Sequence, residues 1–272
     1  MLDLGTALKR RELVVNLAVR TLKVRYKNSA LGFLWTLINP LLMMLIYYVF
    51  IGIVAKIKVD IRIMLTGVIF WQFVVMCTGD AAGAVAGHAN LVKKVYFPRV
   101  LMPFSMCVAN FVNYLLSLVV LLVLIIVIST TSNDPNVTLD LAWLWLLPLA
   151  LVLQFALVFG IALIVSALNV YFKDIEHITS VVLMALFFMS PIIYPVKMVR
   201  PEESTASVLS NWYMMNPLAS LVTLVRRAFL GASGQPWPPE WTFVPSLALS
   251  LVVLAFGLWL FSRLEPHFAD QL

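Results

Sequence analysis

Six long stretches of the 272-residue chain carry almost no charge, and they constrain the fold more than any other feature. Each is about 20 residues or longer, which is enough for a helix to cross the hydrocarbon core of a bilayer. Because 62% of the residues are hydrophobic and only 12% are charged, a soluble domain with a polar surface is excluded. We therefore expect an all-α integral membrane protein with six transmembrane helices, at residues 33–53, 63–87, 100–129, 141–170, 178–196 and 241–262.

Six spans would place both termini on the same side of the membrane, and the positive charges indicate which side. The segments expected on the side of the termini carry 12 Lys and Arg, whereas the segments expected on the other side carry 7. Cytoplasmic loops of membrane proteins contain more Lys and Arg than the loops on the other side, so we expect both termini to be cytoplasmic. The first apolar run exceeds 20 residues and lacks a small-residue cleavage site, so we expect it to be retained as a span.

Residues 7–27 are too charged to cross a membrane, but they are predicted to form an amphipathic helix in the membrane interface. The alternative is a helical tail whose cations only set the topology. The predicted apolar stripe consists of Leu8, Val15, Ala18, Val19, Leu22 and Tyr26. The neighbouring cationic stripe consists of Lys9, Arg20, Lys23 and Lys27.

Prolines interrupt two of the predicted spans. Pro40 removes a backbone N–H from the first span and is expected to kink it, and a bent helix can line a cavity. Pro191 and Pro195, in SPIIYP, are expected to break the fifth span near its outer end. In the section that follows, residues 208–231 are half apolar but too polar at their ends to cross, so we expect short re-entrant helices separated by Asn216-Pro217.

Asp80 is the only acidic residue within any predicted span. A carboxylate in hydrocarbon is costly unless it faces protein or water, so we expect either a functional role or a hydrogen bond to a neighbouring helix. Asp80 lies in GDAAGAVAG, residues 79–87, whose small side chains permit close helix approach. Cys77 and Cys107 lie in spans without CxxC spacing and are expected to be small packing residues.

The sequence contains no GxxxxGK[ST], HExxH or GxSxG motif, and His88, His177 and His267 are isolated from one another. We therefore expect no catalytic, metal or cofactor site on this chain. The net charge of +6 is concentrated at the membrane edges, which favours lipid headgroups or a phosphate-bearing substrate over nucleic acid. Paired intramembrane charges and inverted repeats, which are typical of secondary transporters, are not found.

Five segments together resemble a known family. They are LKVRYKNSALGFLWTLINPLLM (22–43), HANLVKKVYFPRVLMP (88–103), NVYFKDIEHI (169–178), SPIIYP (190–195) and MNPLASLVTLVRRAFLG (215–231). In this order they resemble the permease subunit of type-2 ABC exporters. More narrowly, they are similar to the subfamily that exports lipid-linked polysaccharides such as O-antigen, capsule or teichoic acid.

The resemblance implies a homodimer of six-helix permeases in the bacterial inner membrane, driven by two copies of a separate ATPase that holds ATP and Mg. The lack of a phosphate-binding loop on this chain agrees with hydrolysis on that partner. The implied substrate is a lipid-linked glycan that moves from the cytoplasmic to the outer side. The family's interface helix, coupling helix and exit-side re-entrant helices correspond to residues 7–27, 90–99 and 208–231.

The segment NLVKKVYFPR, residues 90–99, combines the apolar anchors and charges that a contact with an ATPase requires. Pro98 is expected to end its helix before the next span. The alternative is a positively charged loop with a turn proline, which needs the cations but not Tyr96 and Phe97. The expected ATPase-contacting residues are Leu91, Lys93, Lys94, Val95, Tyr96, Phe97, Pro98 and Arg99, and a second cytoplasmic loop carries Tyr171, Phe172, Lys173 and Asp174.

Substrate contacts are expected in two places. The basic interface helix would receive acidic phosphates, and the resemblance implies a path lined by aromatic side chains, which suit sugar faces and lipid alike. For each aromatic residue the alternative is a lipid-facing or packed position. The candidates are Arg20, Lys23, Arg25 and Lys27 for the phosphates, and Tyr47, Tyr48, Phe70, Trp71 and Phe73 for the path.

Two other functions stay open. An exporter of the same architecture for a small molecule or drug would couple to its ATPase in the same way. An ATP-independent transporter or a membrane scaffold would bind no ATPase. Co-purification of an ATPase, lost on Tyr96→Ala/Phe97→Ala/Arg99→Glu, would separate the exporters from this last class.

Overall fold

The described part of the chain is predominantly helical and contains no strand among the described residues. The computed structural model describes residues 11–27, 29, 31–54, 56, 60–88, 93, 97–131, 144–198, 213–231 and 240–271. Its main elements are α2 (Arg11–Tyr26), α3 (Trp35–Tyr47), the π-helix η2 (Tyr48–Val54), α4 (Ile61–Ala86), α6 (Leu101–Thr131), α7 (Leu147–Tyr171), α8 (Ile175–Phe188), α10 (Pro217–Leu230), α11 (Glu240–Leu264), η5 (Glu265–His267) and α12 (Phe268–Gln271). Short 3-10 turns are η1 (Gly32–Leu34), η3 (Leu144–Leu146) and η4 (Val196–Met198).

Four helical segments of the described chain are long and apolar enough to cross a membrane, which agrees with an integral membrane protein. They are Ile61–Ala86, Leu101–Thr131, Leu144–Tyr171 and Val244–Gln271. The first and fifth predicted spans correspond to the shorter apolar helices Ile38–Val54 and Ile175–Phe188. The number of six spans and the side on which the termini lie therefore stay predictions.

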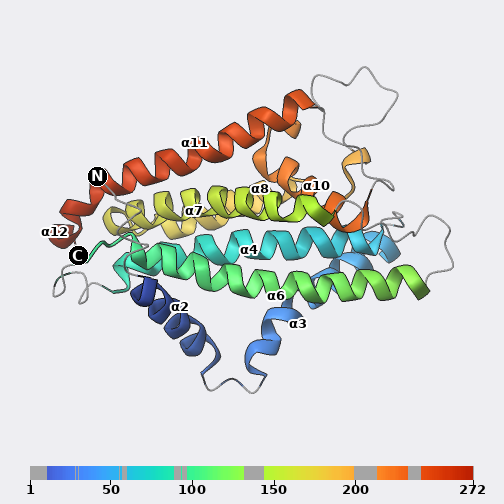
Figure 1. The fold of residues 1–272 in the computed structure, drawn as a ribbon, viewed down its shortest axis with the longest axis horizontal. Helices are drawn as coiled ribbons and strands as arrows, with labels where there is room; N and C mark the ends of the chain where they lie inside the picture. The colour runs from blue at the N-terminus through green and yellow to red at the C-terminus, as the bar shows by residue number, and fades with distance from the viewer. Residues whose placement is uncertain are drawn as a thin grey trace.

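The long helices lie side by side in the order α11, α7, α4 and α6 (Figure 1). α4 and α7 are the inner pair, because 78% and 67% of their most apolar stretches are buried within the chain. The corresponding values for α6 and α11 are 33% and 22%. The outer helices thus keep most of their apolar surface available for lipid, while the inner pair forms the core that positions the other elements.

The two ends of this bundle are distinct (Figure 1). At the end that we call the α12 end, α4 and α7 finish, α6 and α8 begin, and α12 lies beside them. The opposite end, here the α10 end, holds α10 against α4 and α7. The predicted topology assigns the α12 end to the cytoplasm.

Glycines allow backbones to touch at specific crossings. A Cβ on Gly257 of α11 would lie 2.5 Å from the carbonyl oxygen of Gly160 of α7, and a Cβ on Gly160 would lie 2.7 Å from Leu254 Cα. Small residues of this kind let membrane helices approach closely. Gly79 and Gly83 of α4 differ, because a Cβ on either would meet nothing within 4 Å. In residues 79–87 most of the alanines are buried against neighbouring helices. The expected close approach of another helix is absent at Gly79 and Gly83 among the described residues.

A line of polar side chains joins α4 to α6. Asn110 Nδ2 donates to Asp80 Oδ2 at 2.6 Å, so the neighbouring-helix hydrogen bond expected for Asp80 is present. Asn113, one turn further along α6, is 4% exposed, and neither side-chain atom has a hydrogen-bond partner among the described residues. Cys77 and Cys107 are buried and free, as expected of packing residues.

Candidate functional site

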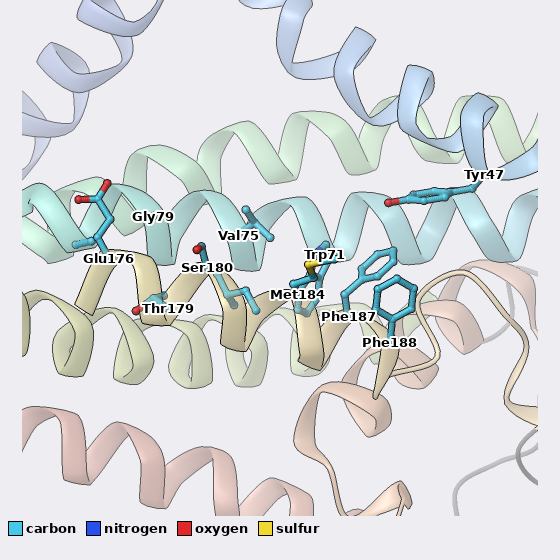
Figure 2. A pocket seen from close by; sticks show the side chains of 12 residues that line it. Tyr47, Trp71, Val75, Gly79, Glu176, Thr179, Ser180, Met184, Phe187 and Phe188 are labelled. Atoms are coloured by element: carbon cyan, nitrogen blue, oxygen red, sulfur yellow. The ribbon is translucent and has the colours of Figure 1, made fainter. Parts of the chain in front are cut away.

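A groove with a volume of about 470 Å³ runs along the face where α3, α4 and α8 meet. Figure 2 shows that its aromatic and polar lining residues separate into two ends. α4 supplies a wall of small and medium side chains, including Val75, Gly79 and Ala82. Because Gly79 has open space where a Cβ would lie, the wall is hollowed at this point.

The groove's aromatic end is built from three helices. Tyr47 of α3 and Trp71 of α4 each place their ring centroid 5.6 Å from that of Phe187 of α8. The Phe188 ring follows, 5.2 Å from Phe187 and 59% exposed. Ring faces of this kind contact both the C–H faces of sugars and acyl chains.

The other end of the groove is polar and lies nearer the α12 end. Glu176 in the first turn of α8, Thr179 and Ser180 supply one carboxylate and two hydroxyls (Figure 2). The Ser180 hydroxyl donates to the carbonyl of His177 at 2.7 Å, so its oxygen remains available as an acceptor. The groove therefore changes from hydrogen-bonding to apolar along its length.

The aromatic candidates from the sequence divide into two groups. Tyr47 and Trp71 line the groove. Phe70 is fully buried, and Phe73 stacks on Tyr114 of α6 with ring centroids 4.9 Å apart, so both point into the core of the chain. Tyr48 starts the π-helix η2 and is 38% exposed, but it is not part of the groove lining.

Sequence reasoning missed the contribution of α8. Met184, Phe187 and Phe188 line the groove together with the polar residues at the start of the same helix. The aromatic pair Phe187-Phe188, one residue before SPIIYP, was a usable signal, because two adjacent aromatic residues in an apolar run are candidates for a lining. The rotation of α8 could not be predicted from the sequence, since the helix is apolar on nearly every face.

The basic helix predicted at residues 7–27 is observed as α2 over Arg11–Tyr26, where residues 7–10 lie outside the described chain. α2 packs on α6, with Val14 and Ala18 buried, while Val15 and Val19 are exposed. Lys27 is exposed, as are the two other described cations, Arg20 and Lys23, and only the backbone of Arg25 is described. The apolar side chains of α2 thus divide between α6 and the surface, and the placement of this helix in a membrane interface stays a prediction.

The described part of the candidate ATPase-contacting segment, Lys93 and residues 97–99, lies at the α12 end. Leu91, Lys94, Val95 and Tyr96 lie outside the described residues. Lys93 is exposed, and Phe97, Pro98 and Arg99 are partly exposed where α6 begins. In the second loop, Phe172 is 63% exposed and Lys173 and Asp174 are exposed, whereas Tyr171 is partly buried.

At the α10 end, a buried arginine clamps three segments together. Arg226 of α10 is fully buried and donates to the carbonyl of Ile63 at 3.0 Å, of Ile192 at 2.8 Å and of Tyr194 at 3.3 Å. α10 begins at Pro217 after the N-cap Asn216, whose side chain also donates to Ser190 Oγ at 3.0 Å. Of the predicted re-entrant segment, residues 208–212 lie outside the described chain.

Comparisons with known proteins agree with this architecture. Residues 12–230 match the family described as ABC-2 type transporter. The chain is 30% identical over 265 residues to a Klebsiella pneumoniae protein named O-antigen export system permease protein RfbA, covering 96% of this chain and 95% of that protein. It is also 30% identical over 264 residues to a protein of the same name from Myxococcus xanthus, covering 96% of each. The chain therefore belongs to the ABC-2 type transporter family, as a multi-pass permease of the inner membrane.

Proposed function

We propose that this chain is the transmembrane channel subunit of an ATP-driven exporter that moves a lipid-linked polysaccharide from the cytoplasmic to the outer side of the membrane. The groove carries the proposal, because its polar end and its aromatic end suit the two chemical parts of such a substrate. The relatives' name, O-antigen export permease, supports a polysaccharide.

The groove is open on one side, and α8 beside it exposes large apolar residues such as Val181 and Met184. We propose that a second copy of the chain faces this side, so that two grooves enclose one path. A two-fold arrangement would need only one self-complementary surface. Membrane lipid would cover the outer faces of α6 and α11.

The basic helix α2 is the proposed receiving site for the substrate's phosphates. Arg20, Lys23 and Lys27 are exposed, and Arg25 belongs to the same helix. Charge reversal at Lys23, Arg25 and Lys27 should lower export and substrate-stimulated ATPase activity, because each cation near the phosphates contributes about 1 kcal/mol. Unchanged export with normal insertion of the variant would remove this role.

Energy would come from a separate ATPase with bound ATP and Mg, two copies to a dimer. The proposed contact is the segment 90–99 together with Phe172 and Lys173, which are exposed at the same end. The Tyr96→Ala/Phe97→Ala/Arg99→Glu variant is expected to lose the ATPase during purification. If the wild-type chain brings down no ATPase, the exporter proposal fails.

A groove variant tests the path itself. Trp71→Ala removes a ring that contacts Phe187, and export of lipid-linked glycan to the outer leaflet should fall about tenfold while the ATPase still binds. Trp259→Ala is a control for the loss of a tryptophan outside the groove, because Trp259 lies on α11, is 51% exposed against 9% for Trp71, and does not line the groove. Equal loss of export in both variants would exclude the groove as the path. Export of a small molecule but of no glycan would select the drug-exporter alternative.

A further inference from the structure

The C-terminal segment touches both of the loops that the proposed function assigns to the ATPase. Leu264 ends α11, Glu265 begins η5 and Phe268 begins α12. Figure 1 shows η5 and α12 at the α12 end, beside the start of α6 and the end of α7. Residues 264–268 are called the C-terminal brace below.

On the α6 side, the brace makes a two-point contact with Arg99. The backbone N–H of Arg99 donates to Glu265 Oε1 at 2.7 Å. The Arg99 guanidinium also donates, through Nη1, to the main-chain carbonyl of Glu265. Hydrogen bonds with a charged partner are stronger than neutral ones, and two of them fix orientation as well as distance. The last residue of the candidate coupling segment is therefore held in one geometry on the brace.

On the α7 side, the brace is anchored by an aromatic residue of the second loop. The Tyr171 hydroxyl donates to the carbonyl of Leu264 at 3.3 Å, and the Tyr171 ring lies 6.2 Å from that of Phe268. Phe268 is fully buried and packs against Phe261 of α11 with ring centroids 5.3 Å apart. This aromatic group of three binds the brace to α7 and α11.

The local reason for these contacts is the end of α11. The last carbonyls of a helix lack partners within it, and the negative end of its dipole favours a cation. Tyr171 satisfies one of these carbonyls, at Leu264, while Arg99 donates to the carbonyl of Glu265, the first residue of η5, which also accepts from the Phe268 backbone N–H. If these hydrogen bonds only terminated the helix, water or donors from a single loop would be enough. Here the donors come from two loops that are 72 positions apart in the sequence.

We propose that the C-terminal brace transmits ATPase movement from the segment 90–99 to α7 and α11, with Glu265 and Tyr171 as positioning residues. This inference rests on the proposed function, in which an ATPase contacts residues 90–99. Displacement of Arg99 moves α6 directly, because α6 begins two residues later. Through the brace, the same displacement also reaches α7 and α11, so three helices move together.

The test uses the full chain, co-expressed with its ATPase and reconstituted with lipid-linked glycan. Glu265→Ala removes the acceptor of the Arg99 N–H bond, whereas Glu265→Gln keeps an oxygen at that position. We expect Glu265→Ala to bind the ATPase and hydrolyse ATP with unchanged KM, while glycan exported per ATP falls about tenfold. Glu265→Gln should restore export, and Asp270→Ala, which removes an exposed carboxylate of α12, should leave it unchanged.

Tyr171→Phe provides a second and milder variant, because it removes only the hydroxyl that reaches Leu264. It should also lower export per ATP. Combined with Glu265→Ala it should lower export per ATP by less than the two separate effects together, since both changes weaken the same link.

Export per ATP at the wild-type level in Glu265→Ala and Tyr171→Phe would overturn the brace. The brace would also be overturned if Glu265→Gln lowered export per ATP as much as Glu265→Ala does. Loss of ATPase binding in both single variants would overturn it too, because residues 264–268 would then have only a structural role. These outcomes leave the proposed function intact. A wild-type chain that binds no ATPase refutes the proposed function, and the brace with it.

Discussion

Gly67 of α4 lies against the contact between Arg226 and Ile192 at the α10 end. A Cβ at this position would lie 1.9 Å from the carbonyl oxygen of Ile192 and 2.7 Å from Arg226 Nη2. The same oxygen accepts a hydrogen bond of 2.8 Å from Arg226 Nη2. Gly67→Ala therefore inserts a methyl group where a backbone carbonyl and a buried guanidinium already meet.

The expected cost follows from these distances. Ordinary contact between the Cβ and the Ile192 oxygen starts at 3.4 Å, so the carbonyl must retreat by about 1.5 Å, beyond reach of Arg226. Overpacking costs about 1–3 kcal/mol, and loss of a hydrogen bond to a charged group costs about 1.5–3 kcal/mol. Replacing a helical glycine by alanine by itself stabilises the helix by about 0.5–1 kcal/mol, which offsets part of this cost. The free energy of unfolding should fall by about 2–5 kcal/mol, and Tm by roughly 5–15 °C.

The assay is thermal unfolding of the purified permease in detergent, followed by tryptophan fluorescence and by recovery of the folded peak in size exclusion. Gly83→Ala is the matched control on the same helix, because a Cβ at Gly83 meets nothing within 4 Å, and its Tm should stay or rise. The reasoning is refuted if Gly67→Ala melts as high as Gly83→Ala. Arg226→Met combined with Gly67→Ala should cost less than the sum of the two, because both changes disrupt the contact at Ile192.

Two further stability predictions use the same assay. Gly257→Ala should lower the free energy of unfolding by about 1–3 kcal/mol, because its Cβ would lie 2.5 Å from the Gly160 carbonyl oxygen and would push α11 away from α7. A Tm equal to that of the wild type would show that the two helices do not touch at this position. Asn113→Leu should raise Tm, because a buried amide without described partners costs about 1–3 kcal/mol and leucine fills a similar volume. A lower Tm for Asn113→Leu would instead indicate that the amide is hydrogen-bonded through water.

The long spans were the easiest part of the fold to predict. The runs predicted at 63–87, 100–129, 141–170 and 241–262 are helices within a few residues of those bounds. This success has a simple cause, because in hydrocarbon each backbone group must be satisfied inside its own segment. The fifth predicted span is shorter than expected. α8 ends at Phe188, before Pro191, and the following residues form turns.

The candidate site was only partly predictable. Tyr47 and Trp71 were expected beside a path and line the groove, but Phe70 and Phe73 belong to the same helix as Trp71 and point into the core. Adjacent residues on a helix point about 100° apart, so a run of aromatic residues always divides between faces. Nothing in the run itself indicates which face is buried, because all of its members are apolar.

Arg226 illustrates the same limit for a charged residue. In the sequence it is one of two adjacent arginines in an apolar stretch, with no sign that it would be fully buried. Its acceptors are backbone carbonyls of α4 and of the segment after α8, and every residue type carries a carbonyl. No pattern of side chains could therefore have identified its partners.

Residue composition and hydrophobic runs by themselves determined that the chain is a helical membrane protein and roughly where its long helices lie. The sequence also marked the basic helix and the charged segment at residues 90–99, because charge in an apolar chain is conspicuous. Tertiary structure alone decided which faces of α3, α4 and α8 form the groove, and which loops meet at Glu265. The physical reason is that helix formation is a local property of the backbone, whereas helix rotation and loop contacts depend on how distant surfaces fit together.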